Sequence, residues 1–344
     1  MDVLVTGGAG YIGSTICSAL SDRGDTPIIL DSLVTGQARF CRDFPFYFGD
    51  IAQPGILARI KSDFPSCETV IHCAARIIIS ESVADPHLYF QENVSKGISF
   101  LKEAIEFGID KIIFSSSASV YGHTANDQVD ESAPCQPSSP YASSKLMFEN
   151  ILAAYCRAYD AKALCLRYFN PIGADPKLRT GQMIKQPSHL LGRLLDTMHG
   201  FSPAFTVFGT DWPTRDGTAI RDYIHVWDLA LAHLAAVDYL YDTSPIRGTC
   251  EIFNIGTGKG TTVQEFVNGF NLVSPKPVHI EFGSRRDGDV VGAFANPSKA
   301  QRLLRWQPKR NIDEGIYDAI QWISSQSERP HNSWQDTVET NLKD

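Results

Sequence analysis

Two side chains four residues apart, Tyr141 and Lys145, have the types and the spacing to move a proton. A Ser followed by Pro140 predicts the start of a helix that continues to about Tyr159, and this helix places both residues on one face. A phenol with a pKa near ~10 is a poor base at neutral pH, but a neighbouring ammonium favours the phenolate. By itself Tyr-x-x-x-Lys is a common surface pattern, so its meaning depends on the surrounding chain.

Three consecutive serines supply hydroxyl groups for the same chemistry. The strand predicted at residues 111–114 runs out into Ser115, Ser116 and Ser117. Ligands of parallel α/β sheets bind beyond the carboxyl ends of the strands, so these hydroxyls belong in that crevice. The simpler alternative is a polar strand end without further function.

A glycine-rich turn at the start of the chain predicts a dinucleotide site. Gly7, Gly10 and Gly13 lie between a predicted strand at residues 3–6 and a predicted helix at residues 14–23. Such a turn directs backbone N–H groups and the positive end of a helix dipole at one spot, which a pyrophosphate can approach because no Cβ intervenes. A glycine-rich turn alone is a weak signal, and its context decides.

That context includes Asp31, which ends the second predicted strand, residues 27–30, about 20 residues further on. A carboxylate there accepts hydrogen bonds from both ribose hydroxyls and repels a 2′-phosphate. The pattern therefore favours NAD over NADP. A solvated turn aspartate is the competing interpretation.

Alternating strands and helices predict the fold that positions these residues, a Rossmann-type doubly wound parallel α/β sheet with a smaller mixed α/β substrate lobe. We expect a long helix at residues 87–107 and a last helix at 312–324. The predicted dinucleotide domain covers residues 1–171, to which residues of about 216–256 return. The predicted lobe covers residues 172–215 and 257–325, including a helix at 297–304, and residues 326–344 are expected to form a loose polar tail.

Composition narrows the class of protein. The 344 residues carry a net charge of −8 without a basic block, so nucleic acid is not an expected partner. We predict no signal peptide and no membrane span, because the apolar runs are short. The eight cysteines form no CxxC pair, and we expect free thiols, no metal and a reducing cytoplasm.

Together with the block LRYFNPIGA at residues 166–174, these motifs resemble the extended short-chain dehydrogenase/reductase family. The resemblance is close to its UDP-glucose (UDP-galactose) 4-epimerase branch and extends to about residue 322. Its most specific motifs are PYASSKLM at 140–147, DGT at 216–218, RDYIHV at 221–226 and RRDGD at 285–289.

The resemblance implies an NAD-dependent isomerase, usually dimeric, that works on a UDP-hexose. C4 of the sugar is oxidised, the 4-keto intermediate turns about its phosphate link, and its other face is reduced. Tyr141 would be the base and then the acid, Lys145 would hold the nicotinamide ribose, and Ser117 would bond the reacting hydroxyl. The NAD site would further include the following residues: Gly7, Gly10, Tyr11, Ile12, Gly13, Asp31, Asp50, Ile51, Cys73, Ala74, Ala75, Asn93, Ser115 and Tyr168.

The nucleotide sugar would be held by residues of the second half of the chain. The positions that match are Phe169, Asn170, Ser188, His189, Leu190, Arg221, Tyr223, Arg286 and Asp289. Two arginines suit a doubly anionic diphosphate, because each offers a planar fork of donors.

Three positions depart from the family pattern. The family usually has a Lys in the segment after its fourth strand, whereas the only cation of that segment here is Arg76, one place earlier. His189 stands where the family usually has an Asn. Ala293 stands where many such epimerases have a bulky Tyr that walls the sugar pocket. We interpret Ala293 as room for an N-acetyl group, so that UDP-GlcNAc and UDP-GalNAc would also react.

Other functions are considered beside this one. A nucleotide-sugar 4,6-dehydratase or decarboxylase needs an added acid and base where this chain has Ala118 and Ser119. A UDP-glucuronate 4-epimerase would need a cation for the C6 carboxylate, for which Arg76 is a candidate. A binding protein that has lost catalysis would commonly lack the Tyr or the Lys.

Overall fold

The apolar runs predicted as strands pair side by side in one parallel sheet. The computed structural model describes residues 1–122, 124, 127–183, 187, 189–242, 247–286 and 289–327. Within these ranges a seven-stranded sheet has the order β12-β7-β5-β4-β1-β2-β3. Its strands are β1 (Asp2–Thr6), β2 (Thr26–Asp31), β3 (Phe46–Phe48), β4 (Thr69–His72), β5 (Lys111–Ser117), β7 (Lys162–Tyr168) and β12 (Thr249–Ile255).

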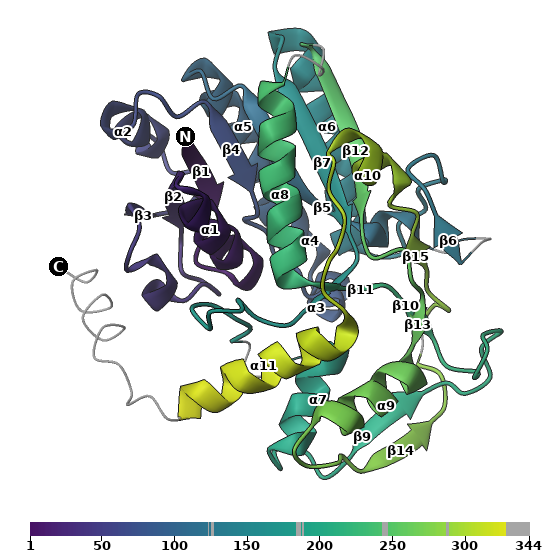
Figure 1. Ribbon diagram of the computed structural model, residues 1–344. Helices are drawn as coiled ribbons and strands as arrows, with labels where there is room; N and C mark the ends of the chain where they lie inside the picture. Colours follow the sequence, from purple (N-terminus) through teal and green to yellow (C-terminus); the bar gives the residue numbers. More distant parts are fainter. Residues whose placement is uncertain are drawn as a thin grey trace.

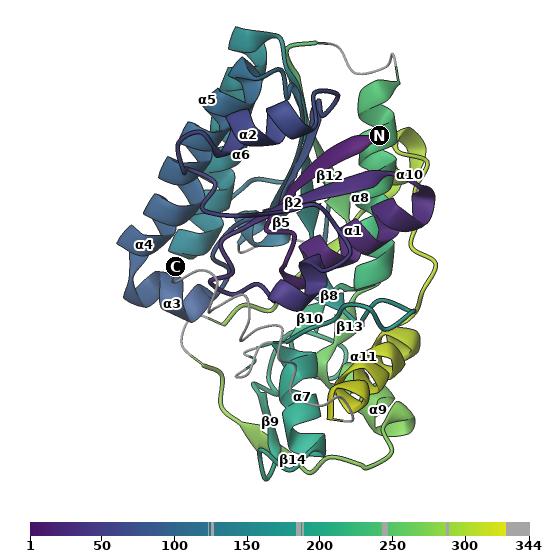
Figure 2. The same ribbon diagram turned by 90° about the vertical axis from the view of Figure 1, so that its left-hand side faces the viewer.

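Helices cover both faces of this sheet, which confirms the predicted doubly wound fold (Figures 1 and 2). Val3 and Val5 of β1 pack toward one face and Leu4 toward the other, so both faces are apolar. One face carries α1 (Tyr11–Arg23), α8 (Val226–Tyr241) and α10 (Ser298–Leu303). The other carries α2 (Ile56–Asp63), α5 (Lys96–Glu106) and α6 (Pro140–Tyr159).

The long helix expected at residues 87–107 is divided by a wider turn. It consists of α4 (Pro86–Phe90), the π-helical turn η2 (Gln91–Ser95) and α5. The π turn carries Asn93, whose side chain reaches the segment after β4. π-Helical turns within α-helices are frequent at functional sites.

A second group of elements lies below the carboxyl edge of the sheet in Figure 1. It comprises α7 (Leu190–Met198), β9 (Phe205–Phe208), α9 (Val263–Val273), β14 (Ile280–Gly283) and α11 (Ile312–Ser327). β9 and β14 pair in parallel, and Leu194, Phe270 and Ile316 belong to one apolar core.

Short strands join the two groups. β8 (Asn170–Ile172) pairs with β11 (Tyr223–His225), β10 (Ile220–Arg221) with β13 (Thr261–Thr262), and β6 (Gln128–Val129) with β15 (Phe294–Ala295). The remaining short helices are η1 (Ala38–Cys41), α3 (Ile79–Ala84) and η3 (Ala118–Tyr121). These pairings bring strands from distant parts of the chain to the edge of the large sheet where ligands bind.

Two details differ from the expectations. The helix expected in the smaller lobe, α10, packs on β12, where Ala300 joins the core beside α8 and Lys299 Nζ donates to the Ile252 carbonyl at 2.7 Å. The last helix continues past Ser324 to Ser327, so Gln326 is helical rather than part of a loose tail, while residues 328–344 lie outside the described ranges. The domain boundaries themselves stay a prediction. No helix in the described ranges is long and apolar enough to cross a membrane.

Candidate active site

The three serines end β5 instead of following it. They pair in register with Leu166, Arg167 and Tyr168 of β7, which holds their backbone in the sheet. Beyond them the Ser117 side chain accepts from the Ser119 N–H at 3.2 Å and caps η3. Ser117 is therefore fixed at the carboxyl edge of the sheet.

Helix α6 starts where its sequence predicts and presents Tyr141 and Lys145 to that edge. The Ser139 hydroxyl accepts from the Ala142 N–H at 3.2 Å, and Pro140 occupies the first helical turn. Lys145 Nζ donates to the Ser115 carbonyl at 2.9 Å and lies 5.9 Å from the centre of the Tyr141 ring. The sheet and the helix thus bring the predicted catalytic groups together.

Burial moves the two titrating groups in opposite directions. It raises the pKa of the Tyr141 phenol, an effect that nearby Ser117 opposes in part. It lowers the pKa of the Lys145 ammonium to about 8, because a charged amine is costly away from water. The phenolate therefore needs positive charge beside it.

The hydroxyl of Ser115 has two polar neighbours, while its carbonyl accepts from Lys145. Its hydroxyl lies 3.2 Å from His233 Nε2 and 3.1 Å from the Cys73 sulfur. Burial lowers the pKa of His233 to about 4, so the ring is neutral. Its Nδ1 donates to the Leu229 carbonyl at 2.9 Å, which leaves Nε2 to accept from Ser115.

The glycine turn fits an anion. Gly7 has a φ of +69°, and a Cβ there would lie 2.8 Å from the Ala74 nitrogen; a Cβ on Gly13 would lie 2.2 Å from the Gly7 oxygen. Gly10 precedes α1, and α1 has neither a side-chain cap nor an acidic residue in its first turn. The positive end of α1 is therefore left for a ligand, as a pyrophosphate requires.

Asp31 shapes the same turn from β2. Its two oxygens accept from the Ala9 N–H at 2.9 Å and the Leu33 N–H at 2.7 Å. Burial raises its pKa, and these two bonds oppose that change. A Cβ on Gly36 would lie 2.8 Å from Asp31, so this glycine keeps space beside the carboxylate. Carboxylate oxygens have further lone pairs, with which Asp31 can accept ribose hydroxyls.

Other residues expected at NAD are engaged with the protein. Asp50 accepts from Lys96 Nζ at 2.6 Å. Asn93 clamps the Arg76 backbone, accepting from its N–H at 2.8 Å and donating to its carbonyl at 3.0 Å. The Arg76 guanidinium lies 3.5 Å from Glu81. These groups fix the loops after β3 and β4.

Tyr11 joins α1 to the segment that follows β8. Its hydroxyl donates to the Gly173 carbonyl at 2.7 Å. Tyr168, at the end of β7, has its pKa raised by burial and by nearby Tyr141. Of the remaining positions, Ile12, Ile51 and Ala74 pack against the sheet cores, and Ala75 follows β4.

Phe169 and Ala293 share one apolar cluster with Val120 and Tyr121 of η3. Asn170, next to Phe169, is exposed, and its N–H donates to the Asp222 carbonyl at 3.0 Å. The position singled out for an N-acetyl group therefore lies close in space to a residue expected to contact the sugar.

The groups that we expect to hold the diphosphate form hydrogen bonds with one another and with the backbone. Arg221 donates to the Ile220 and Val291 carbonyls at 2.6 and 2.9 Å, and burial lowers its pKa. Arg286 makes two 3.0 Å bonds to Asp289. Tyr223 packs on Phe266 in the apolar core of the second group of elements.

His189 caps α7 rather than pointing freely at a ligand. Its Nδ1 accepts from the Gly192 N–H at 3.1 Å, and burial lowers its pKa to about 4. Its Nε2 is buried without a partner among the residues that the structure describes. Leu190 begins α7 and packs on the apolar core of the second group of elements, and Ser188 lies outside the described residues.

Two charged groups were not singled out from the sequence. Asp222 accepts four bonds, from the Thr257 N–H and hydroxyl and from the Gly258 and Ala295 N–H groups, at 2.6–3.1 Å. Glu149 forms a buried pair with Arg167. A charge within an apolar strand, as at Arg167, was the available signal, because such a charge must be paired.

Comparisons with known proteins agree with this geometry. Residues 3–256 match the model of the NAD dependent epimerase/dehydratase family. A UDP-glucose 4-epimerase of Halalkalibacterium halodurans is 39% identical over 332 residues, 96% of this chain and 97% of that protein. The crystal structure of a Stenotrophomonas maltophila UDP-glucose-4-epimerase, with bound NAD and formylated UDP-arabinopyranose, aligns with a TM-score of 0.90 at 36% identity, covering 95% of this chain and 99% of that one. A UDP-Glc/GlcNAc 4-epimerase from Campylobacter jejuni aligns with a TM-score of 0.82 at 32% identity, covering 94% and 99%.

Proposed function

Because this chain belongs to the NAD-dependent epimerase/dehydratase family, we propose that it is an NAD-dependent UDP-glucose 4-epimerase that interconverts UDP-glucose and UDP-galactose. The observation that supports this most strongly is the meeting of Tyr141, Lys145 and Ser117 at the edge of the sheet that also carries the glycine turn.

The glycine turn and Asp31 would hold NAD, which when bound supplies a reversible acceptor for a hydride from the sugar. Lys145 would contact its nicotinamide ribose. The second group of elements, with Arg221 and Arg286, would hold the UDP portion. We propose this division of labour between the predicted dinucleotide domain and the predicted lobe.

Tyr141 would carry the proton in both directions. As a phenolate it takes the proton of the C4 hydroxyl, which Ser117 orients by a hydrogen bond. The Lys145 ammonium favours that phenolate by its positive charge. After the 4-keto sugar has turned and its other face has been reduced, the same phenol returns the proton to the C4 oxygen.

Elimination of water is disfavoured by the residues beside Ser117. Ala118 and Ser119 occupy the first positions of η3, and neither can transfer a proton at neutral pH. For a UDP-glucuronate epimerase, Arg76 would have to face the sugar, but it lies 3.5 Å from Glu81. We therefore expect no turnover of UDP-glucuronate.

The experiment that tests the function is Tyr141→Phe. We expect this change to lower the rate of UDP-galactose conversion about 100-fold or more, because it removes the acid and base. NMR of the products and the amount of bound NAD would be measured together. Tyr47→Phe is the control, since Tyr47 is a buried tyrosine whose hydroxyl bonds Asp63 away from the site. Full activity of Tyr141→Phe would show that the base is misassigned.

A second substrate pair is favoured by Ala293. This methyl lies in the apolar cluster with Phe169, which we expect to contact the sugar, and the similar Campylobacter jejuni enzyme is named for both substrates. We propose that UDP-GlcNAc and UDP-GalNAc are also interconverted. Ala293→Tyr should lower their turnover relative to UDP-glucose about tenfold or more. An unchanged ratio of the two activities would contradict this proposal.

We also propose that the enzyme is a cytoplasmic homodimer. All eight cysteines are free thiols, as a reducing compartment permits. Sedimentation of the purified protein would test the dimer, and a monomer at micromolar concentration would exclude it.

A further inference from the structure

A buried carboxylate on α6 lies beside the catalytic groups and takes no part in the chemistry above. Glu149 follows Lys145 by one helical turn, on the same face as Tyr141. Its Oε1 accepts from the Ser116 hydroxyl at 2.5 Å and from Arg167 Nε at 2.9 Å, and its Oε2 accepts from Arg167 Nη2 at 2.6 Å. All three side chains are buried, where such a charge must be paired and bonded.

Ser116 lies on β5 between two residues that are close to Lys145 and Tyr141 of α6. The residue before it, Ser115, accepts from Lys145 Nζ through its carbonyl. The residue after it, Ser117, is near enough to Tyr141 to lower the pKa of its phenol. Because side chains alternate along a strand, the Ser116 hydroxyl projects to the opposite face from those of Ser115 and Ser117 and meets Glu149 there.

Arg167 extends the contact across the sheet. It is in register with Ser116 on β5 and with Asn254 on β12. Its guanidinium lies 4.9 Å from the centre of the Tyr121 ring, and the Tyr121 hydroxyl donates to Asn254 at 2.6 Å. Tyr121 ends η3, the segment that Ser117 caps, so the contacts lead back to the catalytic serine.

From this geometry we propose that Glu149 is a positioning residue, which sets the spacing between α6 with Tyr141 and Lys145 and the end of β5 with Ser117. The inference rests on the proposed function. A displacement of about 1 Å between reacting groups can lower a rate about 100-fold, so a rigid link at this point has consequences for the rate.

Glu149 also acts on the charge of Lys145. Its carboxylate favours the ammonium, which burial disfavours. The titratable groups that face Lys145 are Tyr141 and Glu149 on α6, and His72 and Cys73 at the end of β4. Burial lowers the pKa of His72 to about 3 and raises that of Cys73 to about 11, so both are uncharged near neutral pH. Glu149 is the negative charge of this set.

The first test removes only the link to the strand. Ser116→Ala deletes the hydroxyl that bonds Glu149 and leaves the Arg167 pair intact. Thr69→Val is the matched control, because Thr69 is a buried residue at the opposite end of β4 whose hydroxyl lies 2.9 Å from that of Tyr241. We expect kcat of the NAD-loaded enzyme to fall about tenfold in Ser116→Ala, with KM and melting temperature as in Thr69→Val. Equal kcat values in the two variants would overturn the positioning role.

The second test needs no turnover. In protein with isotope-labelled lysine, NMR follows the titration of Lys145, assigned by comparison with Lys145→Met. Glu149→Gln should lower the pKa of Lys145 below its wild-type value, and Glu149→Asp, which keeps the charge, should restore most of it. An unchanged pKa of Lys145 in Glu149→Gln would overturn the inference that the Glu149 carboxylate stabilises the Lys145 ammonium. If the wild-type protein epimerised no UDP-sugar, the proposed function would fail, while this titration would still report on Glu149.

Discussion

At the scale of single residues, we expect the proposed base, Tyr141, to stay protonated until positive charge lies beside it. Burial raises the pKa of Tyr141, and Ser117 offsets only part of that effect. Lys145 is held near the ring by the Ser115 carbonyl, but burial makes its own charge costly. A cationic nicotinamide would add the charge that the phenolate lacks, so cofactor binding and base activation are expected to be coupled.

We expect Lys145 to set the alkaline limit of activity. Its pKa, about 8 in the folded protein, is below the ordinary lysine value of ~10.4, so the ammonium is lost as pH rises through about 8. Below that pH the charge supports the Tyr141 phenolate, and above it the support disappears. We expect kcat to fall about tenfold per pH unit beyond this point. The dependence of kcat on pH at saturating substrate measures this fall. A kcat that stays constant up to the ordinary pKa of lysine would contradict the prediction.

The sequence was sufficient for the groups whose motifs are local. Tyr141 and Lys145 are read from one helix, and Ser117 from one strand end, and the structure brings them together. Glu149, on helix α6, was missed because its partner Arg167 lies on strand β7, 18 residues away. Whether a charge is buried depends on that tertiary pairing, which spacing along the chain does not reveal.

At the scale of elements, the ends of a helix were predicted correctly where neighbouring residues in the sequence determine them. Helix α6 has the predicted extent because its cap and Pro140 precede it and Asp160 adopts a left-handed conformation after it. β5 is longer than predicted, since pairing with β7 keeps three polar serines in the sheet. Pairing between distant segments overrides local polarity, so such a boundary could not be read from the sequence.

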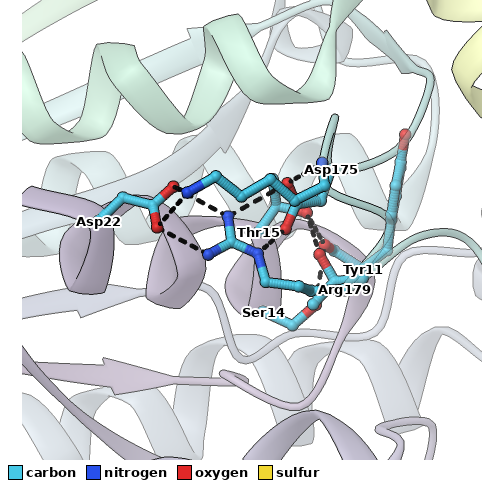
Figure 3. A network of polar contacts seen from close by, with 8 residues as sticks. Tyr11, Ser14, Thr15, Asp22, Asp175 and Arg179 are labelled. Atoms are coloured by element: carbon cyan, nitrogen blue, oxygen red, sulfur yellow. Dashed lines mark hydrogen bonds and ion pairs between the residues drawn. The ribbon is translucent and has the colours of Figure 1, made fainter.

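The loop from Gly173 to Gly181 supports α1, the helix that follows the glycine turn (Figure 3). Arg179 connects Asp175 of this loop to Asp22 of α1, with bonds of 2.8 and 3.0 Å to Asp22. Asp175 is fully buried, and its N–H donates to the Thr180 carbonyl at 2.9 Å. Together with the Tyr11 hydroxyl on Gly173, these bonds attach the loop to α1.

Loss of Arg179 should therefore destabilise the protein. Arg179→Ala leaves the buried Asp175 carboxylate without its cation, and we expect the free energy of unfolding to fall by about 2–3 kcal/mol. Lys177→Ala is the control, because the Lys177 side chain makes an exposed pair with Asp22, worth about 0–1 kcal/mol. Guanidinium unfolding of both variants would compare them. Equal losses would refute the bridging role of Arg179.

At the scale of the whole molecule, the two groups of elements are interleaved in sequence. β12 is a strand of the large sheet and α8 packs on that sheet, although both follow α7 and β9 of the other group. The doubly wound fold followed from the alternation of strands and helices in the first half of the chain. The packing of α10 on β12 could not be predicted from that alternation. A helix this short can cover the core of either group of elements, and only tertiary contacts decide between them.

This arrangement places one proton carrier and one cofactor turn at a single sheet edge, which suits a reaction with no net redox change. The most direct test uses UDP-galactose with deuterium at C4 and analyses the UDP-glucose product by NMR. We predict that deuterium stays at C4, because the hydride that leaves the sugar returns to it without exchange with water. Loss of the deuterium to solvent would contradict the account.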